Sequence, residues 1–97
     1  MLTEQQKHIT IETIKPYKPT YIGLFGSYAR NEEIENSDID ILYDFNPNAK
    51  VSLFDLMDLE ELLKNKLKKN IDLVSKRFMN KHIKPNIEKD LKTLFIA

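Results

Sequence analysis

The spacing of apolar residues in the second half of the chain predicts one long helix. Between residues 52 and 66, apolar side chains recur at intervals of three and four, the repeat of one face of an α-helix. Ser52 opens this run with Asp55 three residues later, a combination typical of a helix N-terminus. We expect a helix over residues 52–66 whose apolar face packs in the core: Leu53, Leu56, Met57, Leu63 and Leu67, widened by Leu59 and Leu62.

Three shorter stretches have the pattern of β-strands. Residues 21–25 form an apolar run, residues 39–45 alternate apolar and polar side chains, and residues 70–75 form a third short apolar stretch. The predicted helix separates the last two, and a strand–helix–strand crossover makes such strands parallel neighbours. The expected fold class is therefore α/β (α+β), with a small mixed sheet of three or more strands flanked by helices.

Both ends of the chain carry further signals. Thr3 and Gln6 match a capping box, and the helix that they begin should end near Lys15 because Pro16 follows.

Near the C-terminus, apolar residues spaced by four predict a helix around residues 85–92. The apolar tail at residues 94–96 is expected to dock on the core or to pair with a partner.

The candidate chemistry lies between the first two strands. Gly26 and Ser27 leave the first strand, and Asp38 and Asp40 open the second on one face, because successive strand side chains alternate. If these strands pair antiparallel, the Gly-Ser turn lies beside the two carboxylates. Parallel pairing of the third strand brings Asp72 level with them. Carboxylate oxygens and a turn open to phosphate are the parts of a Mg²⁺-triphosphate site.

Each of these residues also has a structural interpretation. Asp72 fits a solvated strand entry, and Ser27 fits a cap of the following turn. Arg30, one helical turn after Ser27, is placed to reach phosphate oxygens or to pair with an acidic neighbour. Asp44 shares the face of Asp38 and Asp40 but lies further along the strand, where we expect a surface position.

Composition narrows the class of protein. The 97 residues suit a single domain, 1–97, with 41% hydrophobic and 31% charged side chains. No apolar run approaches the roughly 20 residues of a membrane-spanning helix, and the N-terminus lacks the pattern of a signal peptide. The chain contains no cysteine, as is common in a reducing compartment. We expect a cytoplasmic protein without a membrane partner.

The net charge of zero conceals an asymmetry. Residues 1–63 carry 5 basic and 12 acidic side chains, whereas residues 64–97 carry 10 basic and 3 acidic ones. One interpretation is solvated helix faces, and the other is a basic surface for an acidic partner or a nucleic acid.

The complete spaced motif is more specific than its parts. Gly26-Ser27-Tyr28-Ala29-Arg30, followed by Ser37-Asp38-Ile39-Asp40-Ile41, resembles the signature of the DNA polymerase beta-like nucleotidyltransferase superfamily, and in particular the minimal nucleotidyltransferase (MNT) family. Two positions depart from that pattern. Asn31 stands where family members commonly have Gly, and Tyr28 stands where a basic residue is frequent.

The resemblance implies a fold, a reaction and a partner. Asp38, Asp40 and Asp72 would bind Mg²⁺, two ions in the family's arrangement, while Gly26, Ser27 and Arg30 would contact the nucleotide. The implied activity is transfer of AMP from ATP to a tyrosine hydroxyl of a cognate HEPN-family toxin, an RNase, with release of pyrophosphate. The chain would then be an antitoxin that forms a hetero-oligomer with its target.

Two other functions remain open from the sequence. An antitoxin that neutralises its partner by binding alone would use the basic C-terminal third and the tail at residues 94–96 as its contact surface. An RNA-binding module has only the local basic charge in its favour, without interleaved aromatic residues, so direct nucleic-acid binding is not expected.

Overall fold

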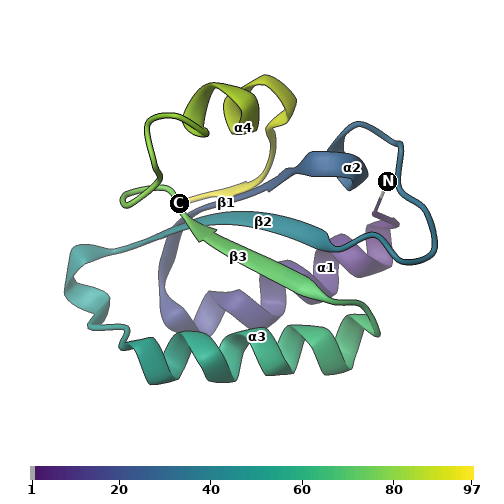
Figure 1. The fold of residues 1–97 in the computed structure, drawn as a ribbon. Helices are drawn as coiled ribbons and strands as arrows, with labels where there is room; N and C mark the ends of the chain where they lie inside the picture. The colour runs from purple at the N-terminus through teal and green to yellow at the C-terminus, as the bar shows by residue number, and fades with distance from the viewer. Residues whose placement is uncertain (1) are drawn as a thin grey trace.

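The computed structural model describes residues 2–97 and shows a four-stranded sheet at the centre of the fold (Figure 1). The strand order is β3-β2-β1-β4, in which β1 pairs antiparallel with both β2 and β4, and β2 pairs parallel with β3. The predicted mixed sheet and its parallel pair are confirmed. The strands are β1 (Pro19–Phe25), β2 (Ile39–Phe45), β3 (Ile71–Ser75) and β4 (Lys92–Ile96).

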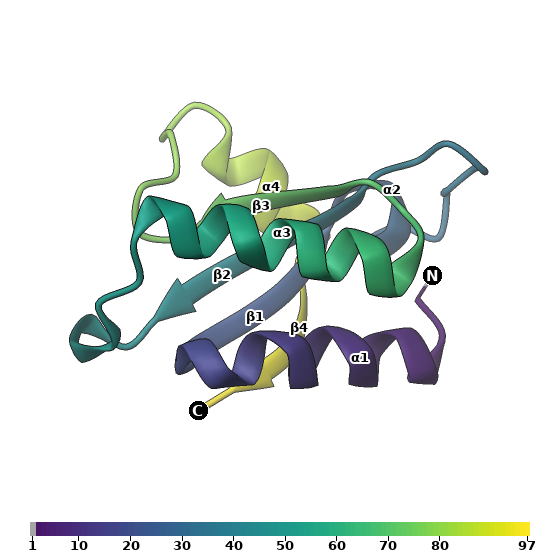
Figure 2. The same cartoon turned by 90° about the horizontal axis from the view of Figure 1, so that it is seen from below.

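Helices cover both faces of this sheet. Two long helices, α1 and α3, lie side by side on one face, and the shorter α4 lies on the other (Figures 1 and 2). A single turn, α2, follows β1 directly, and two short 3₁₀ helices complete the set. The helices are α1 (Glu4–Ile14), η1 (Lys15–Tyr17), α2 (Gly26–Ala29), η2 (Pro47–Ala49), α3 (Leu53–Leu67) and α4 (Lys84–Asp90).

The two predicted helix starts are confirmed by their capping boxes. The Thr3 hydroxyl accepts a hydrogen bond from the Gln6 amide at 3.1 Å, and the Gln6 side chain accepts one from the Thr3 amide. Ser52 and Asp55 make the same reciprocal pair at the start of α3. Backbone N–H groups that the helix itself cannot pair are satisfied in this way.

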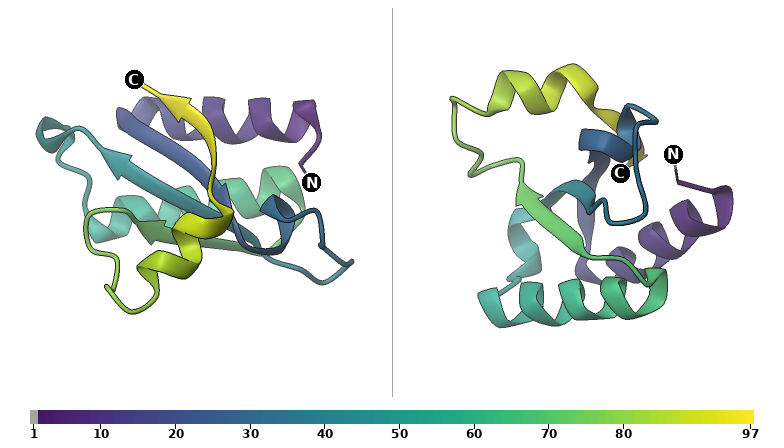
Figure 3. Two further views of the ribbon diagram at one scale, coloured as in Figure 1. Left: turned by 90° about the horizontal axis from the view of Figure 1, so that it is seen from above. Right: turned by 45° about the vertical axis from the view of Figure 1, so that its right-hand side comes forward.

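The core has a large side and a small side. Ile22 of β1 and Ile41 of β2 pack with Leu63 of α3 on the face covered by α1 and α3. On the opposite face, Leu42 packs in a smaller cluster with Ile87 of α4. Because strand side chains alternate, the even-numbered side chains of β2 lie on the face opposite α1 and α3. The ribbon of α4 covers only part of that face (Figure 3).

The predicted apolar face of α3 was partly wrong. Leu59, Leu63 and Leu67 are buried, but Leu53 and Met57 are 72% and 56% exposed. An α-helix turns by about 100° per residue, so Met57 points roughly opposite to Leu59. The sheet and α1 cover only one side of α3, and this leaves the other side in solvent. Leu62, at the flank of the buried stripe, is 42% exposed.

The C-terminal tail is part of the sheet. The predicted helix ends at Asp90, two residues earlier than expected, because Leu91 adopts an extended backbone. The chain then pairs with β1 as the edge strand β4, and Leu94 and Phe95 pack against the core. Of the two roles expected for the tail, the structure shows docking on the core. No helix within residues 2–97 is long and apolar enough to cross a bilayer.

Leu63→Ala is expected to lower the free energy of unfolding by about 3 kcal/mol, because Leu63 is fully buried and its truncation leaves a cavity. Leu53→Ala is the matched change at an exposed position of the same helix, and it should alter that free energy by less than about 0.5 kcal/mol. Urea unfolding followed by circular dichroism measures both. Equal losses at the two positions would contradict the orientation of α3.

Candidate functional site

The turn from β1 into α2 lies against the second aspartate of the motif. Gly26 has φ +74°, a left-handed conformation that favours glycine. A Cβ added to Gly26 would overlap Oδ2 of Asp40, so the carboxylate lies directly on the glycine backbone. Antiparallel pairing of Phe25 with Asp40 produces this approach. The expected meeting of the Gly-Ser turn with the carboxylates is confirmed for Asp40.

The chain leaves α2 through a second left-handed residue. Asn31 has φ +60°, the conformation expected from an Asn in place of the family's Gly. Asn31 therefore adopts the left-handed conformation for which glycine is otherwise the usual residue.

Three aspartates share the face beside this turn. Asp40 pairs with Asp72 across the parallel β2–β3 ladder, and Asp38 precedes Asp40 by two residues. Asp38 and Asp72 are exposed, whereas Asp40 is partly buried. Partial burial, followed by the negative charges of Asp72 and Asp38, raises the pKa of Asp40 to about 6. The predicted carboxylate trio is thus brought to one edge of the sheet.

The trio suits a hard cation in its donor chemistry. Carboxylate oxygens are the ligands that Mg²⁺ prefers, and a cation would relieve the repulsion that raises the pKa of Asp40. In residues 2–97, however, no three acidic, histidine or cysteine side chains lie close enough together to hold an ion as they stand. The pairing of β2 with β3 brings the donors near one another, and an ion bound by all three would require their side chains to move closer together.

Ser27 lies in the single turn of α2, directly after Gly26. Ser27 is partly buried, and α2 begins without a side-chain cap in the part of the chain that the structure describes. The expected alternative, in which the Ser27 hydroxyl caps the turn, is therefore not seen. The first N–H groups of a helix have no partner within the helix, so they are able to donate to an anion.

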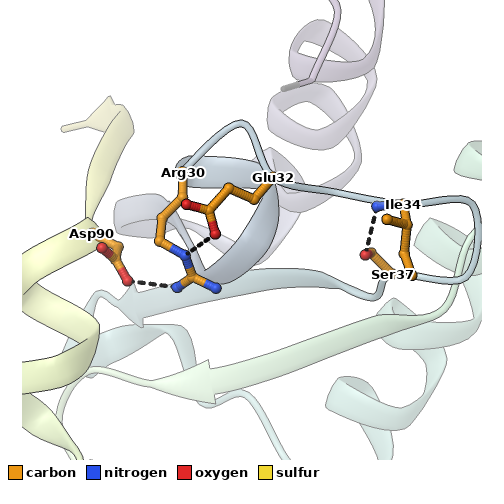
Figure 4. A network of polar contacts seen from close by, with 5 residues as sticks. All are labelled: Arg30, Glu32, Ile34, Ser37 and Asp90. Atoms are coloured by element: carbon orange, nitrogen blue, oxygen red, sulfur yellow. Dashed lines mark hydrogen bonds and ion pairs between the residues drawn. The ribbon is translucent and has the colours of Figure 1, made fainter.

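Arg30 is held by two carboxylates at the edge of the site. Its Nη1 donates to Oδ2 of Asp90 at 2.7 Å, and its Nε donates to Oε2 of Glu32 at 3.2 Å (Figure 4). These hydrogen bonds, with that to Asp90 the larger effect, raise the pKa of Arg30. Pairing with acidic neighbours, one of the two roles considered for Arg30, is the role that the structure shows.

Sequence reasoning missed Asp90. It lies 60 residues from Arg30 and has no spacing that links it to the motif. Only the packing of α4 over β1 and α2 brings it to the site. Glu32 could have been predicted as a partner of Arg30, since it follows Arg30 by only two residues in the loop after α2.

Two other polar residues, Tyr28 and Asp44, have structural roles outside the candidate site. Tyr28 is 5% exposed and packs in the core, so its ring is not available on the surface of the site. Asp44 lies 3.6 Å from Arg77, at the far end of β2 from the aspartate trio. It does not belong to the site.

Asp40→Asn is expected to stabilise the metal-free protein at neutral pH. The folded-state pKa of about 6 lies above the ordinary Asp value, so the folded state retains a proton that the unfolded chain has lost between about pH 4 and 6. Stability therefore falls as pH rises through this window, and the variant should escape that loss. With allowance for solvent screening, the gain at pH 7.5 is about 1 kcal/mol and disappears near pH 4.

Urea unfolding in EDTA at the two pH values measures this effect. Asp58→Asn, which removes an exposed carboxylate of α3, is the matched control and should show no such pH-dependent gain. An equal gain in the free energy of unfolding in both variants would mean that the gain does not arise from the surroundings of Asp40.

Gly26→Ala should lower the free energy of unfolding by at least about 2 kcal/mol. The new side chain both disfavours the left-handed backbone and overlaps the Asp40 carboxylate. Ser27→Ala, one residue later within α2, should cost less than about 0.5 kcal/mol. Thermal unfolding compares the two, and a Gly26→Ala protein as stable as the wild type would refute the close contact.

Comparison with known proteins places this geometry in a family. Residues 10–94 match the model of the nucleotidyltransferase domain. A protein of Methanocaldococcus jannaschii, named as a candidate protein adenylyltransferase, is 44% identical over 81 residues, covering 82% of this chain and 81% of its own. The protein adenylyltransferase MntA of Thermococcus cleftensis is 40% identical over 70 residues, covering 72% and 69%.

A solved structure described as a toxin-antitoxin with AMP-PNP superimposes with a TM-score of 0.77 at 26% identity, covering 94% of this chain and 73% of that one. The match to the nucleotidyltransferase domain begins at residue 10 within α1, ends at residue 94 within β4, and includes the turn and strands that carry Gly26, Asp40 and Asp72. The fold class and family indicated by the sequence motif are confirmed, and the chain belongs to the nucleotidyltransferase domain family.

Proposed function

We propose that this protein transfers AMP from ATP to a tyrosine hydroxyl of a HEPN-family toxin and thereby acts as its antitoxin. The observation that carries the proposal is the contact of the Gly26 turn with Asp40, which lies opposite Asp72 in the sheet. A phosphate-binding turn and a carboxylate group at one edge are the two parts that nucleotidyl transfer requires. The protein adenylyltransferase among the relatives supports AMP as the transferred group.

The reaction needs positioning more than covalent chemistry. In the proposed reaction, the Gly26 turn and the Ser27 hydroxyl bind the β- and γ-phosphates, which directs the α-phosphorus toward the incoming hydroxyl. A bond forms between the tyrosine oxygen and the α-phosphorus as the bond to the bridging oxygen of pyrophosphate breaks. The hydroxyl proton passes to a carboxylate oxygen of Asp72, the more exposed member of the Asp40–Asp72 pair.

Asp38, Asp40 and Asp72 are the proposed ligands of Mg²⁺, with two ions as the family resemblance implies. When bound, Mg²⁺ would neutralise triphosphate charge and orient the phosphates. Burial and the charges of Asp72 and Asp38 raise the pKa of Asp40, Arg30 offsets only part of that rise, and bound Mg²⁺ would lower the pKa further.

ATP is the proposed nucleotide. The solved toxin-antitoxin with AMP-PNP, an ATP analogue, shares this fold over most of the chain and supports that choice. The acceptor is proposed to arrive on the partner protein, so the two chains would associate as a hetero-oligomer during the reaction.

Intact mass spectrometry of the partner toxin tests the proposal. The protein is incubated with Mg²⁺, ATP and the product of the neighbouring gene, and the toxin should gain the mass of one or more AMP groups. Asp38→Asn should reduce the transfer rate by at least about 100-fold, because it removes a carboxylate from the reacting centre. EDTA should abolish transfer.

Asp44→Asn is the matched control. Asp44 lies on β2 and on the same face as Asp40, but it pairs with Arg77 away from the three aspartates. Its substitution should leave the rate of AMP transfer within about twofold of wild type. If the toxin gains no mass while a stable complex still forms, the protein neutralises by binding alone and the enzymatic proposal is wrong.

A further inference from the structure

The ion pair between Arg30 and Asp90 joins two distant parts of the chain at the edge of the site. Arg30 follows α2, and Asp90 is the last residue of α4. The side chain of Asp90 is only 17% exposed, against 66% for Glu32, the other partner of Arg30. Figure 4 shows the guanidinium between these two carboxylates. The Asp90 bond is therefore the shorter and better shielded of the two.

The position of Asp90 is fixed by packing on both sides. Ile87, one turn earlier in α4, is buried in the cluster with Tyr21 and Leu42. Leu91, the next residue, packs against the same cluster, and its amide donates to the carbonyl oxygen of Glu88. A carboxylate between two anchored residues is able to hold a partner side chain in one orientation.

The two bonds leave a defined part of Arg30 for another anion. They use Nε and Nη1, while a guanidinium has a third nitrogen, Nη2, in the same rigid plane. The backbone amide of Arg30 donates to the carbonyl oxygen of Gly26 at 3.1 Å, so Arg30 belongs to the turn that contacts Asp40. Arg30 thus lies beside the site, and two carboxylates hold its guanidinium.

We propose that Asp90 is a positioning residue, which holds the Arg30 guanidinium beside the Gly26 turn so that Nη2 meets a phosphate oxygen of the bound nucleotide. This inference rests on the proposed function, since it assigns a further element of the triphosphate site. An arginine that is already ordered loses less side-chain entropy on binding than a mobile one. The C-terminal α4 is, on this basis, part of the nucleotide site.

Steady-state AMP transfer at varied ATP concentration tests the role. Arg30→Gln should raise the KM for ATP by about 30-fold with little change in kcat, as expected when a ground-state phosphate contact is lost. Asp90→Asn should raise that KM by about 5-fold, and Asp90→Glu should restore part of the loss. Glu88→Gln, which removes an exposed carboxylate of α4 paired with Lys84, is the matched control and should not change KM.

The double variant separates positioning from general stability. In an Arg30→Gln background, Asp90→Asn should have no further effect on KM, because Asp90 acts only through Arg30. An equal 5-fold rise in both backgrounds, or a fall in kcat at unchanged KM, would overturn the proposal.

NMR of the arginine Nε–H groups gives a readout that needs no nucleotide. The chain contains two arginines, Arg30 and Arg77, so the signals are easily assigned. The Arg30 signal should report a rigid side chain in the wild type and in Glu88→Gln, and a mobile one in Asp90→Asn. A mobile Arg30 in the wild type would refute the positioning role.

The two arms distinguish the failure of this inference from failure of the proposed function. If the wild type neither transfers AMP nor binds ATP, the proposed function is wrong and the nucleotide role of Asp90 falls with it. If the wild type transfers AMP but Asp90→Asn leaves the KM and the Arg30 signal unchanged, only this inference is wrong.

Discussion

Strand pairing around β2 is the constraint on which the site depends. Antiparallel pairing with β1 places the end of β1, and so the Gly26 turn, beside Asp40. Parallel pairing with β3 places Asp72 opposite the same residue. A slip of one residue in either register would turn these side chains to the α1 and α3 face, where the core is apolar. The burial of Ile39 and Ile41 on that face therefore fixes the chemistry on the other.

Repulsion among the three carboxylates of the site lowers the stability of the protein when no cation is bound. Three carboxylates lie along one edge, and burial together with the charges of Asp72 and Asp38 raises the pKa of Asp40. Arg30 offsets part of this repulsion and is itself held by Asp90 and Glu32. Such crowding is common where a protein keeps a site ready for a cation, because the binding of the cation repays the cost.

Local sequence patterns predicted the helices, the strands and the motif. The features that they did not predict depend on packing between distant parts of the chain. The capping boxes at Thr3 and Ser52 and the left-handed Asn31 follow from a few neighbouring residues. The exposed Leu53 could not be predicted, because periodicity identifies an apolar stripe but does not say how wide a face the rest of the fold will cover. The Asp90 partner of Arg30 depends on the path of α4 and on β4 pairing with β1, which no local signal contains.

Paramagnetic NMR tests the central claim, that one edge of the sheet binds a metal-nucleotide complex. Mn²⁺ replaces Mg²⁺ in a titration with a non-hydrolysable ATP analogue, and the broadening of backbone amide signals identifies the nearest residues. The account predicts that signals at Gly26, Ser27, Asp38, Asp40 and Asp72 broaden first, and that Asp40→Asn weakens the effect. Broadening centred elsewhere, or none at millimolar metal, would contradict it.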